Sequence, residues 1–186
     1  MDLNRLTQRS QEAFSEAQSL ATRFGHQQVD AEHLLLALCR QDQGLIPRLL
    51  SRMDIDPAGV AASVEQALER RPSVSGPGAE PGKVFVTQRL NEVLVNAEAE
   101  AKRLKDEYVS VEHLVLAFLD EGDKHAAGKV LKSFNVTRDR FLSTLTAVRG
   151  SQRVTSSHPE AAYEALEKYG VDLVAQARAG KLDPVI

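Results

Sequence analysis

The stretch Val29-Asp30-Ala31-Glu32-His33-Leu34-Leu35-Leu36-Ala37-Leu38 has a close copy 80 residues later, Val109-Ser110-Val111-Glu112-His113-Leu114-Val115-Leu116-Ala117-Phe118. Both copies predict the start of a buried helix. Asp30 and Ser110 carry short side-chain oxygens that can accept hydrogen bonds from the free N–H groups of a first helical turn. Glu32 and Glu112 would then lie in that turn, at the positive end of the helix dipole. The apolar run that follows is too continuous for a surface helix.

The duplication extends beyond this stretch. Residues 7–38 align with residues 87–118 without a gap, and 13 of the 32 pairs are identical, among them Thr7 with Thr87 and Arg9 with Arg89. After one inserted residue the offset becomes 81, and apolar positions such as Leu50 and Leu131 continue to match. Self-similarity at a fixed period indicates a structural repeat. We therefore expect two four-helix units that pack with pseudo-twofold symmetry and meet at a seam.

Composition favours an all-helical protein. Hydrophobic residues make up 42% of the 186, aromatic residues only 5%, and Trp is absent, so the core must consist of Leu, Val and Ala. The single cysteine, Cys39, excludes an internal disulfide. A net charge of −3 with no long basic stripe argues against nucleic-acid binding. The N-terminus lacks the apolar core of a signal peptide, and no apolar run approaches a membrane span, so we expect a soluble, cytoplasmic protein with no membrane partner.

Two stretches rich in loop-forming residues divide the chain. Residues 72–83 hold three prolines and three glycines and predict a linker between a first repeat, at about 3–71, and a second, at about 84–149. Together the repeats form a domain over 1–149. Residues 150–159 predict a second, flexible linker, and residues 160–186 begin with a short amphipathic helical tail.

The chain lacks the usual motifs of catalysis. A phosphate-binding loop needs four residues between its glycine and the Gly-Lys pair, whereas Gly76 and Gly82 are separated by five. His33 and His113 each follow a glutamate, but neither lies in the His-Glu-x-x-His pattern of a zinc protease. We expect hydrogen-bonded core histidines, no metal and no nucleotide. A metal-dependent hydrolase that uses both histidines is the remaining enzymatic alternative.

The duplicated polar residues permit two interpretations. Thr7, Glu32, Thr87 and Glu112 can be helix-start residues and nothing more. Alternatively, repeat symmetry brings them to the seam, where they would bind a peptide or a cationic side chain. Asp106 would then add an acceptor, and Leu94 would give peptide side chains an apolar floor, unless it is plain core.

These motifs together resemble the N-terminal domain of Clp-type AAA+ chaperones, of the ClpB type. The resemblance rests on the 80-residue duplication, the Thr-Gln-Arg near the start of each repeat and the paired Glu-His-Leu helices. The resemblance covers essentially the whole chain. In the tail it rests on three further passages: Gln152-Arg153-Val154-Thr155, Tyr163-Glu164-Ala165-Leu166-Glu167-Lys168-Tyr169-Gly170 and Gly180-Lys181-Leu182-Asp183-Pro184-Val185-Ile186. The ClpC relatives share the duplicated domain but usually lack the first two of these passages.

The resemblance implies a double Clp N motif that binds unfolded polypeptides, at the start of an ATP-driven disaggregase. Family substrate contacts map onto Thr7, Thr87, Asp106 and Glu112. Residues 160–186 would begin the first ATPase module. ATP and Mg, the contacts of a homohexameric ring and cooperation with a DnaK-type chaperone would belong to regions outside this chain, which itself would be monomeric, non-enzymatic and free of cofactors. The alternative is an adaptor-docking or phosphoarginine-reading domain of a ClpC-like unfoldase, because Thr7, Glu32, Thr87 and Glu112 match that pattern.

Overall fold

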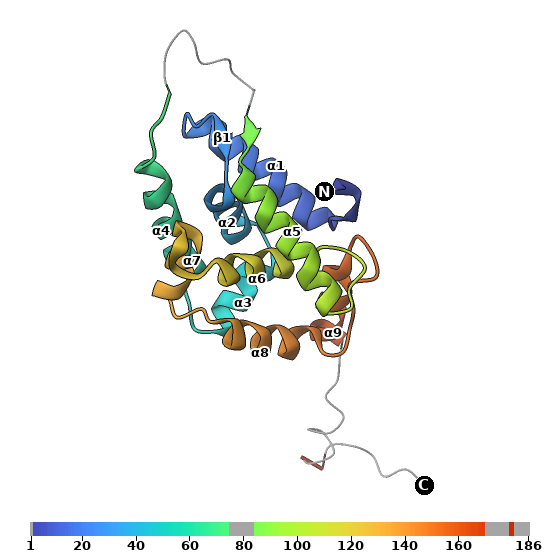
Figure 1. The fold of residues 1–186 in the computed structure, drawn as a ribbon. Helices are drawn as coiled ribbons and strands as arrows, with labels where there is room; N and C mark the ends of the chain where they lie inside the picture. Colours follow the sequence, from blue (N-terminus) through green and yellow to red (C-terminus); the bar gives the residue numbers. More distant parts are fainter. Residues whose placement is uncertain (1, 75–83, 170–178, 181–186) are drawn as a thin grey trace.

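The computed structural model describes residues 2–74, 84–169 and 179–180, without the side chains of 166–169. Nearly all of its regular structure is helical, which confirms the all-α prediction (Figure 1). The first repeat consists of α1 (Gln8–Arg23), α2 (Ala31–Arg40), α3 (Leu45–Arg52) and α4 (Pro57–Glu69). The second consists of α5 (Gln88–Arg103), α6 (Val111–Glu121), α7 (Ala126–Ser133) and α8 (Arg138–Arg149). Two single 3-10 turns, η1 (Leu3–Arg5) and η2 (Gly122–Lys124), precede α1 and α7.

The helix boundaries repeat with the offsets seen in the sequence. The first two helices of each repeat begin 80 residues apart, and the last two begin 81 residues apart. Helix caps repeat as well, because Thr7 and Thr87 each accept a hydrogen bond from the backbone N–H three residues later. Asp30 and Ser110 both form capping boxes, with a histidine in the third helical position, as the cap predictions require.

The turns that end the helices also match between repeats. Gly25 and Lys105, which follow α1 and α5, adopt φ of 68° and 60°. Asp54 and Asn135 occupy equivalent left-handed positions after α3 and α7, with φ of 57° and 58°. At each place the chain reverses through the same hydrogen-bonded turn, even though only the first position is a glycine.

The central helices of the two repeats form one continuous core. Leu34, Leu35, Leu36 and Phe118 are completely buried, because α2 packs against both α1 and α4 while α6 packs against α5, α7 and α8. Contacts of α4 with α7 and of α3 with α8 join the repeats (Figure 1). Burial on all sides explains why the apolar runs in α2 and α6 are continuous rather than periodic.

Two short backbone pairings connect the repeats, and the sequence did not predict them. Strands β1 (Gln28–Val29) and β2 (Phe85–Val86) pair in parallel, and Leu6 forms a parallel bridge with Val109. In each case the residue before the first helix of one repeat pairs with the residue before the second helix of the other. Both pairings lie at helix starts, so they fix the seam by main-chain bonds.

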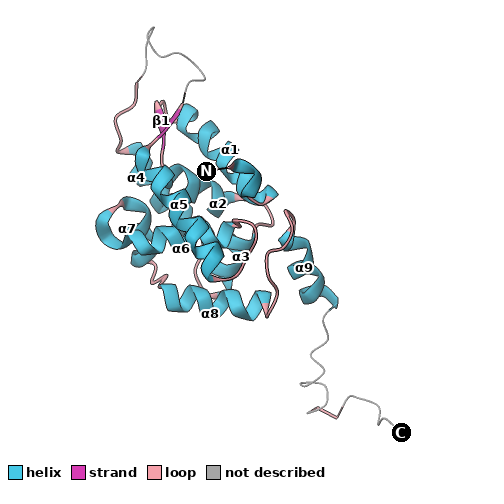
Figure 2. Cartoon of the chain, turned by 45° about the vertical axis from the view of Figure 1, so that its right-hand side comes forward, coloured by secondary structure: helices cyan, strands magenta, loops and turns pink. Residues whose placement is uncertain are grey.

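The segment after α8 lies against both repeats. The sequence predicts a flexible linker at 150–159; in the structure Val154 is buried and its carbonyl accepts a 2.9 Å hydrogen bond from the N–H of Glu107. The carbonyl of Ser157 likewise accepts from the N–H of Gln8, at 2.9 Å. Helix α9 (Pro159–Tyr169) then packs beside α8 at one end of the bundle (Figure 2). Most of the predicted inter-repeat linker and the chain from 170 to 178 and after 180 lie outside the described residues.

Two glycines give a matched test of this packing. A Cβ on Gly128 would lie 2.0 Å from the carbonyl oxygen of Gly122, whose backbone cannot move aside. We expect Gly128→Ala to lower the free energy of unfolding by about 1–3 kcal/mol, or more, despite its better helix propensity. Gly59→Ala in α4 meets only ordinary contacts, the nearest at 3.5 Å. It should raise stability by up to about 1 kcal/mol. Urea unfolding measures both, and a stabilising Gly128→Ala would refute the close approach of η2 to α7.

Candidate functional site at the repeat seam

The structure places the sequence-predicted residues in two clusters at opposite halves of the seam. Thr87 lies with Glu32, next to the β1–β2 pairing. Thr7, Asp106 and Glu112 lie around the Leu6–Val109 bridge. Each cluster combines the start of the first helix of one repeat with the start of the second helix of the other. We call them the Glu32 end and the Glu112 end.

At the Glu32 end, Thr87 connects the repeats. Its Oγ1 accepts a hydrogen bond from the Leu90 N–H at 3.0 Å and donates to Asp30 Oδ1 at 2.9 Å. Burial alone would raise the pKa of Asp30, but the N–H of Ala31 and the guanidinium of Arg71 hold it below its usual value. Thr87 is therefore both a cap of α5 and a cross-repeat donor to the cap of α2.

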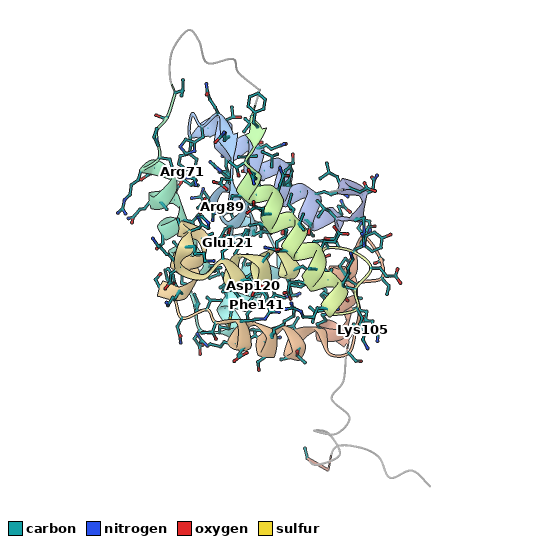
Figure 3. The ribbon with its side chains drawn as sticks, in the orientation of Figure 1. Arg71, Arg89, Lys105, Asp120, Glu121 and Phe141 are labelled. Atoms are coloured by element: carbon teal, nitrogen blue, oxygen red, sulfur yellow. The ribbon has the colours of Figure 1, made fainter. Side chains whose placement is uncertain are left out.

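Glu32 is buried and fully engaged. Its Oε1 accepts from Arg89 at 2.8 Å and from the Ala127 N–H, at the start of α7, at 3.1 Å. Its Oε2 accepts from Arg71 at 2.7 Å. Figure 3 shows Arg71 at the end of α4, with Arg89 and Glu121 between α5 and α6. The carboxylate thus balances the charge of two arginines and of one helix start. A phosphoarginine ligand that binds Glu32 would have to displace one of these partners.

Arg89 joins three helices of both repeats. Besides Glu32 on α2, it binds Glu121 on α6 through two hydrogen bonds of 3.0 and 2.9 Å. Burial lowers the pKa of Arg89, yet the hydrogen bonds and charges of Glu121 and Glu32 outweigh it and raise the pKa above its ordinary value. Arg89 therefore stays charged, and we expect it to stabilise the seam strongly.

A histidine pair borders the Glu32 end. His33 Nδ1 accepts from the N–H of Asp30 at 3.0 Å, so the neutral ring carries its proton on Nε2 and donates it to His26 Nδ1 at 2.8 Å. Burial, then the positive charges of His26 and Arg71, lower the pKa of His33 to about 4. Burial and Arg71 also lower the pKa of His26. The pair is consequently stable only when both rings are neutral.

At the Glu112 end, an aspartate replaces the first histidine. His113 Nδ1 accepts from the N–H of Ser110 at 2.8 Å, and Nε2 donates to Asp106 Oδ2 at 2.8 Å. Asp106 Oδ1 also accepts from the Val154 N–H, at 2.8 Å, and from Arg149. Burial would raise the pKa of Asp106, but these donors hold it below its usual value. Asp106 thus anchors the segment that follows α8.

Glu112 is less completely paired than Glu32. Its Oε2 accepts a hydrogen bond from the Ser110 hydroxyl, while Oε1 lies 3.5 Å from Arg149 Nη1 and has no hydrogen-bond partner in the structure. Thr7 is completely buried, and its hydroxyl bonds only to Ser10, by donating at 3.0 Å and accepting at 3.3 Å. Leu94 is 4% exposed and belongs to the core, so it offers little of an apolar floor.

The arginines were missed in the sequence because their partners are far away along the chain. Arg71, Arg89 and Arg149 reach carboxylates that lie 32–57 residues away along the chain, and only the fold brings them together. Two signals were nevertheless present. Arg9 and Arg89 form an identical repeat pair, and His26 stands opposite Asp106 at the offset of 80. Of these two arginines, Arg89 reaches a carboxylate of the other repeat, whereas Arg9 pairs with its own neighbour Glu12 at 3.4 Å.

The structure also places the histidines and the cysteine that could hold a metal ion or act as a nucleophile. Within residues 2–74 and 84–169, no group of three or more His, Cys, Asp and Glu side chains is placed to hold a metal ion. His33 and His113 belong to separate clusters, and each is already fixed by two partners. Burial raises the pKa of Cys39 to about 12, so its thiol is unreactive. Among the described helices, none has the length and hydropathy needed to cross a membrane.

Exposed apolar side chains lie beside the polar clusters. Leu3 is 53% exposed in η1, Phe85 is 64% exposed in β2, and Val95 is 58% exposed on α5. Arg5 forms an ion pair with Glu98 and thereby holds η1 beside the face of α5 that carries Val95. Leu3 and Phe85 thus lie in the elements of the two backbone pairings or next to them, and Val95 lies on α5, so we call these three side chains the apolar strip.

Comparisons with known proteins agree with this architecture. A model of the Clp repeat (R) N-terminal domain matches residues 5–134. Over all 186 residues the chain is 56% identical to the chaperone protein ClpB of Nitratidesulfovibrio vulgaris, of which it covers 22%. It is 50% identical to ClpB of Bacillus cereus, of which it covers 21%. The chain thus spans about a fifth of the length of these curated relatives.

Solved structures show the same fold. The N-terminal domain of Hsp104 from Candida albicans superimposes with a TM-score of 0.69 at 23% identity, covering 83% of this chain and 97% of that chain. The N-terminal domain of the ClpV1 ATPase from E. coli EAEC gives a TM-score of 0.65 at 24% identity, covering 81% of this chain and 89% of that chain.

The pseudo-symmetry supplies a control for the buried ion pairs. Arg89→Met would leave the Glu32 carboxylate, which is 1% exposed, short of its main partner. We expect a loss of about 3–5 kcal/mol in the free energy of unfolding, measured with urea. Arg9→Met, at the equivalent but more exposed position, should cost less than about 1 kcal/mol. Equal losses would contradict the assignment of Arg89 as the cross-repeat anchor.

The histidine pair predicts a loss of stability in mild acid. Between pH 6.5 and about 4 the unfolded chain binds a proton on His33 that the folded chain does not, so stability falls as pH falls through this window. His26→Asp copies the second repeat, and its carboxylate should favour protonated His33. The drop in urea midpoint from about pH 7 to 5 should therefore be smaller in His26→Asp. His125→Asn, at an exposed position, should match wild type; an unchanged drop in His26→Asp would refute the coupling.

Proposed function

Because the chain belongs to the Clp repeat N-terminal domain family and matches ClpB chaperones over its whole length, we propose that it is the substrate-binding N-terminal domain of an ATP-dependent protein disaggregase. In this role it binds unfolded or aggregated polypeptides along the seam between its repeats. It then delivers them to the hexameric ATPase ring formed by the remainder of the protein. The domain itself is a binding module.

The apolar strip is the observation that carries this proposal. Unfolded polypeptides differ from folded ones chiefly in their exposed apolar side chains, and a binding surface must offer apolar area in return. Leu3, Phe85 and Val95 are large and exposed, and they belong to η1, β2 and α5. Three separate side chains supply limited area, which suits weak and sequence-tolerant capture of many substrates.

The polar clusters support this surface from beneath. Glu32, Glu112 and Thr7 are buried, so their first effect on binding is to hold η1, β2 and α5 in place. Thr87 is half-buried, so a bound chain could perturb it directly, whereas the buried Asp106 would respond through its partners. Leu94 lies just below Val95 in α5. We retain all six as the residues whose environment changes when substrate binds.

The remaining partners follow from the same proposal. ATP and Mg act in the ATPase modules that would follow this chain, where the ring contacts and the site for a DnaK-type chaperone would also lie. The isolated domain is then monomeric, because its core is complete without a second copy. Its location is the cytoplasm. Residues 160–186 would form the first part of the ATPase module when the rest of that module is present.

A second candidate is the reading of phosphoarginine, with adaptor docking, as in a ClpC-like unfoldase. The observation in its favour is that Glu32 already binds two guanidinium groups, those of Arg71 and Arg89. Arg71 comes from the exposed end of α4 and is the partner that a ligand would displace. Tighter binding of phosphoarginine peptides than of arginine peptides, increased further by Arg71→Ala, would favour this candidate over general capture of unfolded chains.

An NMR titration tests the main proposal. With reduced, alkylated α-casein as the unfolded probe, we expect shifts at Leu3, Phe85 and Val95 and at the neighbouring seam residues. Phe85→Ser together with Val95→Ser should weaken binding about thirtyfold, because two exposed apolar contacts of about 1 kcal/mol each are lost. Ala62→Ser, on exposed α4 away from the seam, is the control and should bind normally. Chemical shift changes confined to other surfaces, or equal casein binding by wild type and the double variant, would refute the seam as the binding surface.

A further inference from the structure

The β1–β2 pairing leaves the main-chain groups of one residue without a partner. The N–H groups of Phe85 and Thr87 donate to the carbonyls of Gln27 and Val29, at 3.0 and 3.1 Å. In a parallel pairing, only alternate residues of a strand turn their N–H and C=O toward the partner strand. Because Phe85 and Thr87 face β1 in this way, the N–H and C=O of Val86 point to the opposite side. Neither group has a hydrogen-bond partner among the residues that the structure describes.

Strand β2 is the outer strand of this small sheet. Helix α1 packs against β1, whereas β2 makes its main contacts with β1. Figure 2 shows the strands, in magenta, at one end of the helical bundle. The side chain of Val86 packs partly against the core, and that of Phe85, which alternates to the other face, is 64% exposed. An outer strand with free N–H and C=O groups can pair with another extended chain.

The equivalent edge at the Glu112 end is already capped by the chain itself. Leu6 lies 80 residues before Val86 and pairs across the seam in the same way. The N–H of Leu6 donates to the carbonyl of Leu3 at 3.1 Å, and its carbonyl accepts from the side-chain amide of Gln11 at 3.0 Å. Asn91 stands at the position of Gln11 in the second repeat, but in the described part of the chain it makes no such bond. The capped edge shows which groups the open edge can bind: a main-chain carbonyl and an amide N–H.

We propose that the open edge of β2 binds an extended stretch of unfolded polypeptide as a third strand, by main-chain hydrogen bonds to Val86. This inference rests on the proposed function, because the occupant is the substrate named there. Main-chain N–H and C=O groups are the same in every sequence, so pairing with them tolerates any substrate. In a folded protein these groups are already paired, whereas an unfolded chain offers them freely. Phe85 adds an apolar contact for the side chains of the bound strand.

Amide hydrogen exchange of the full 186-residue chain tests strand addition directly. The probe is the peptide acetyl-Lys-Thr-Val-Thr-Phe-Thr-Val-Thr-Lys-amide, whose apolar side chains alternate with threonines. In the free domain the Val86 amide should exchange fast, while the amides of Phe85 and Thr87, which already donate to β1, exchange slowly. Saturating peptide should slow exchange at Val86 by at least about tenfold and change its two neighbours much less. Unchanged exchange at Val86 in the peptide-saturated domain would overturn the proposal.

N-methylated forms of the same peptide test the geometry of the bound strand. One form is methylated on the backbone nitrogens of its two valines and its phenylalanine, the other on those of the three threonines that follow them. Adjacent residues of an extended chain turn their N–H groups to opposite sides, so only one of the two forms loses donors to β2. We expect that form to bind at least about fivefold more weakly and the other to bind within about twofold of the parent peptide. Equal affinities of the two forms would contradict strand addition.

A proline at position 86 tests the contribution of the protein. Val86→Pro removes the free N–H and leaves the donors of Phe85 and Thr87 in place, and proline is tolerated at such a position of an outer strand. Binding of the peptide should weaken about fivefold, because one hydrogen bond is lost. Val86→Ala, which shortens the side chain and keeps the N–H, should bind within about twofold of wild type. Equal affinities of Val86→Pro and Val86→Ala would refute a role for this N–H.

The outcomes separate this inference from the proposed function. If α-casein changes the chemical shifts of the apolar strip but leaves exchange at Val86 unchanged, strand addition is wrong and the proposed function stands. If neither casein nor the peptide binds, both are refuted. Slow exchange at Val86 in the free domain would also overturn strand addition by substrate. A dependence of that exchange on protein concentration would then identify a second copy of this chain as the occupant of the edge, and its absence would identify a segment of the same chain.

Discussion

Two main-chain hydrogen bonds determine how this domain is built. The N–H of Thr7 donates to the carbonyl of Val109 at 3.0 Å, and the N–H of Thr87 donates to that of Val29 at 3.1 Å. Each bond brings the start of one repeat's first helix against the start of the other repeat's second helix. Two positive dipole ends therefore converge at each site, and this convergence requires buried negative charge. Glu32 and Glu112 meet that requirement, which explains acids in the most buried helices of the fold.

The two ends then differ in how the buried charge is balanced. At one end Arg89 and Arg71 surround Glu32, and the start of α7 adds an N–H donor. At the other, Arg149 is divided between Asp106 and Glu112, and Glu112 keeps an unpaired oxygen. The difference begins with one substitution between the repeats. Asp106 in place of a histidine attracts Arg149 and the segment at Val154, and this segment guides α9 toward Glu112.

The sequence predicted features that depend on neighbours along the chain. The caps at Asp30 and Ser110, the helix starts at Thr7 and Thr87 and the change of offset from 80 to 81 are all local signals, and the structure confirms them. The paired strands β1 and β2 have only two residues each, which is too short to show an alternating pattern, so the sequence does not predict them. The cross-seam reach of Arg89 and the burial of Tyr163 depend on the tertiary arrangement, which repeat symmetry alone does not specify. Symmetry predicted one shared seam, and divergence of the repeats made its ends unlike.

Burial also changes which residues can act first on a partner. A carboxylate such as Glu32, 1% exposed and bound by two arginines, cannot meet a passing chain without rearrangement, whereas Phe85 and Val95 already face solvent. A rearrangement costs least free energy where the fewest hydrogen bonds must be broken. Of the two carboxylates this is Glu112, because its Oε1 has no hydrogen-bond partner. The duplicated acids are in this way unequal in their pairing: Glu32 is bound by Arg71, Arg89 and the Ala127 N–H, whereas Glu112 keeps one buried oxygen without a hydrogen bond.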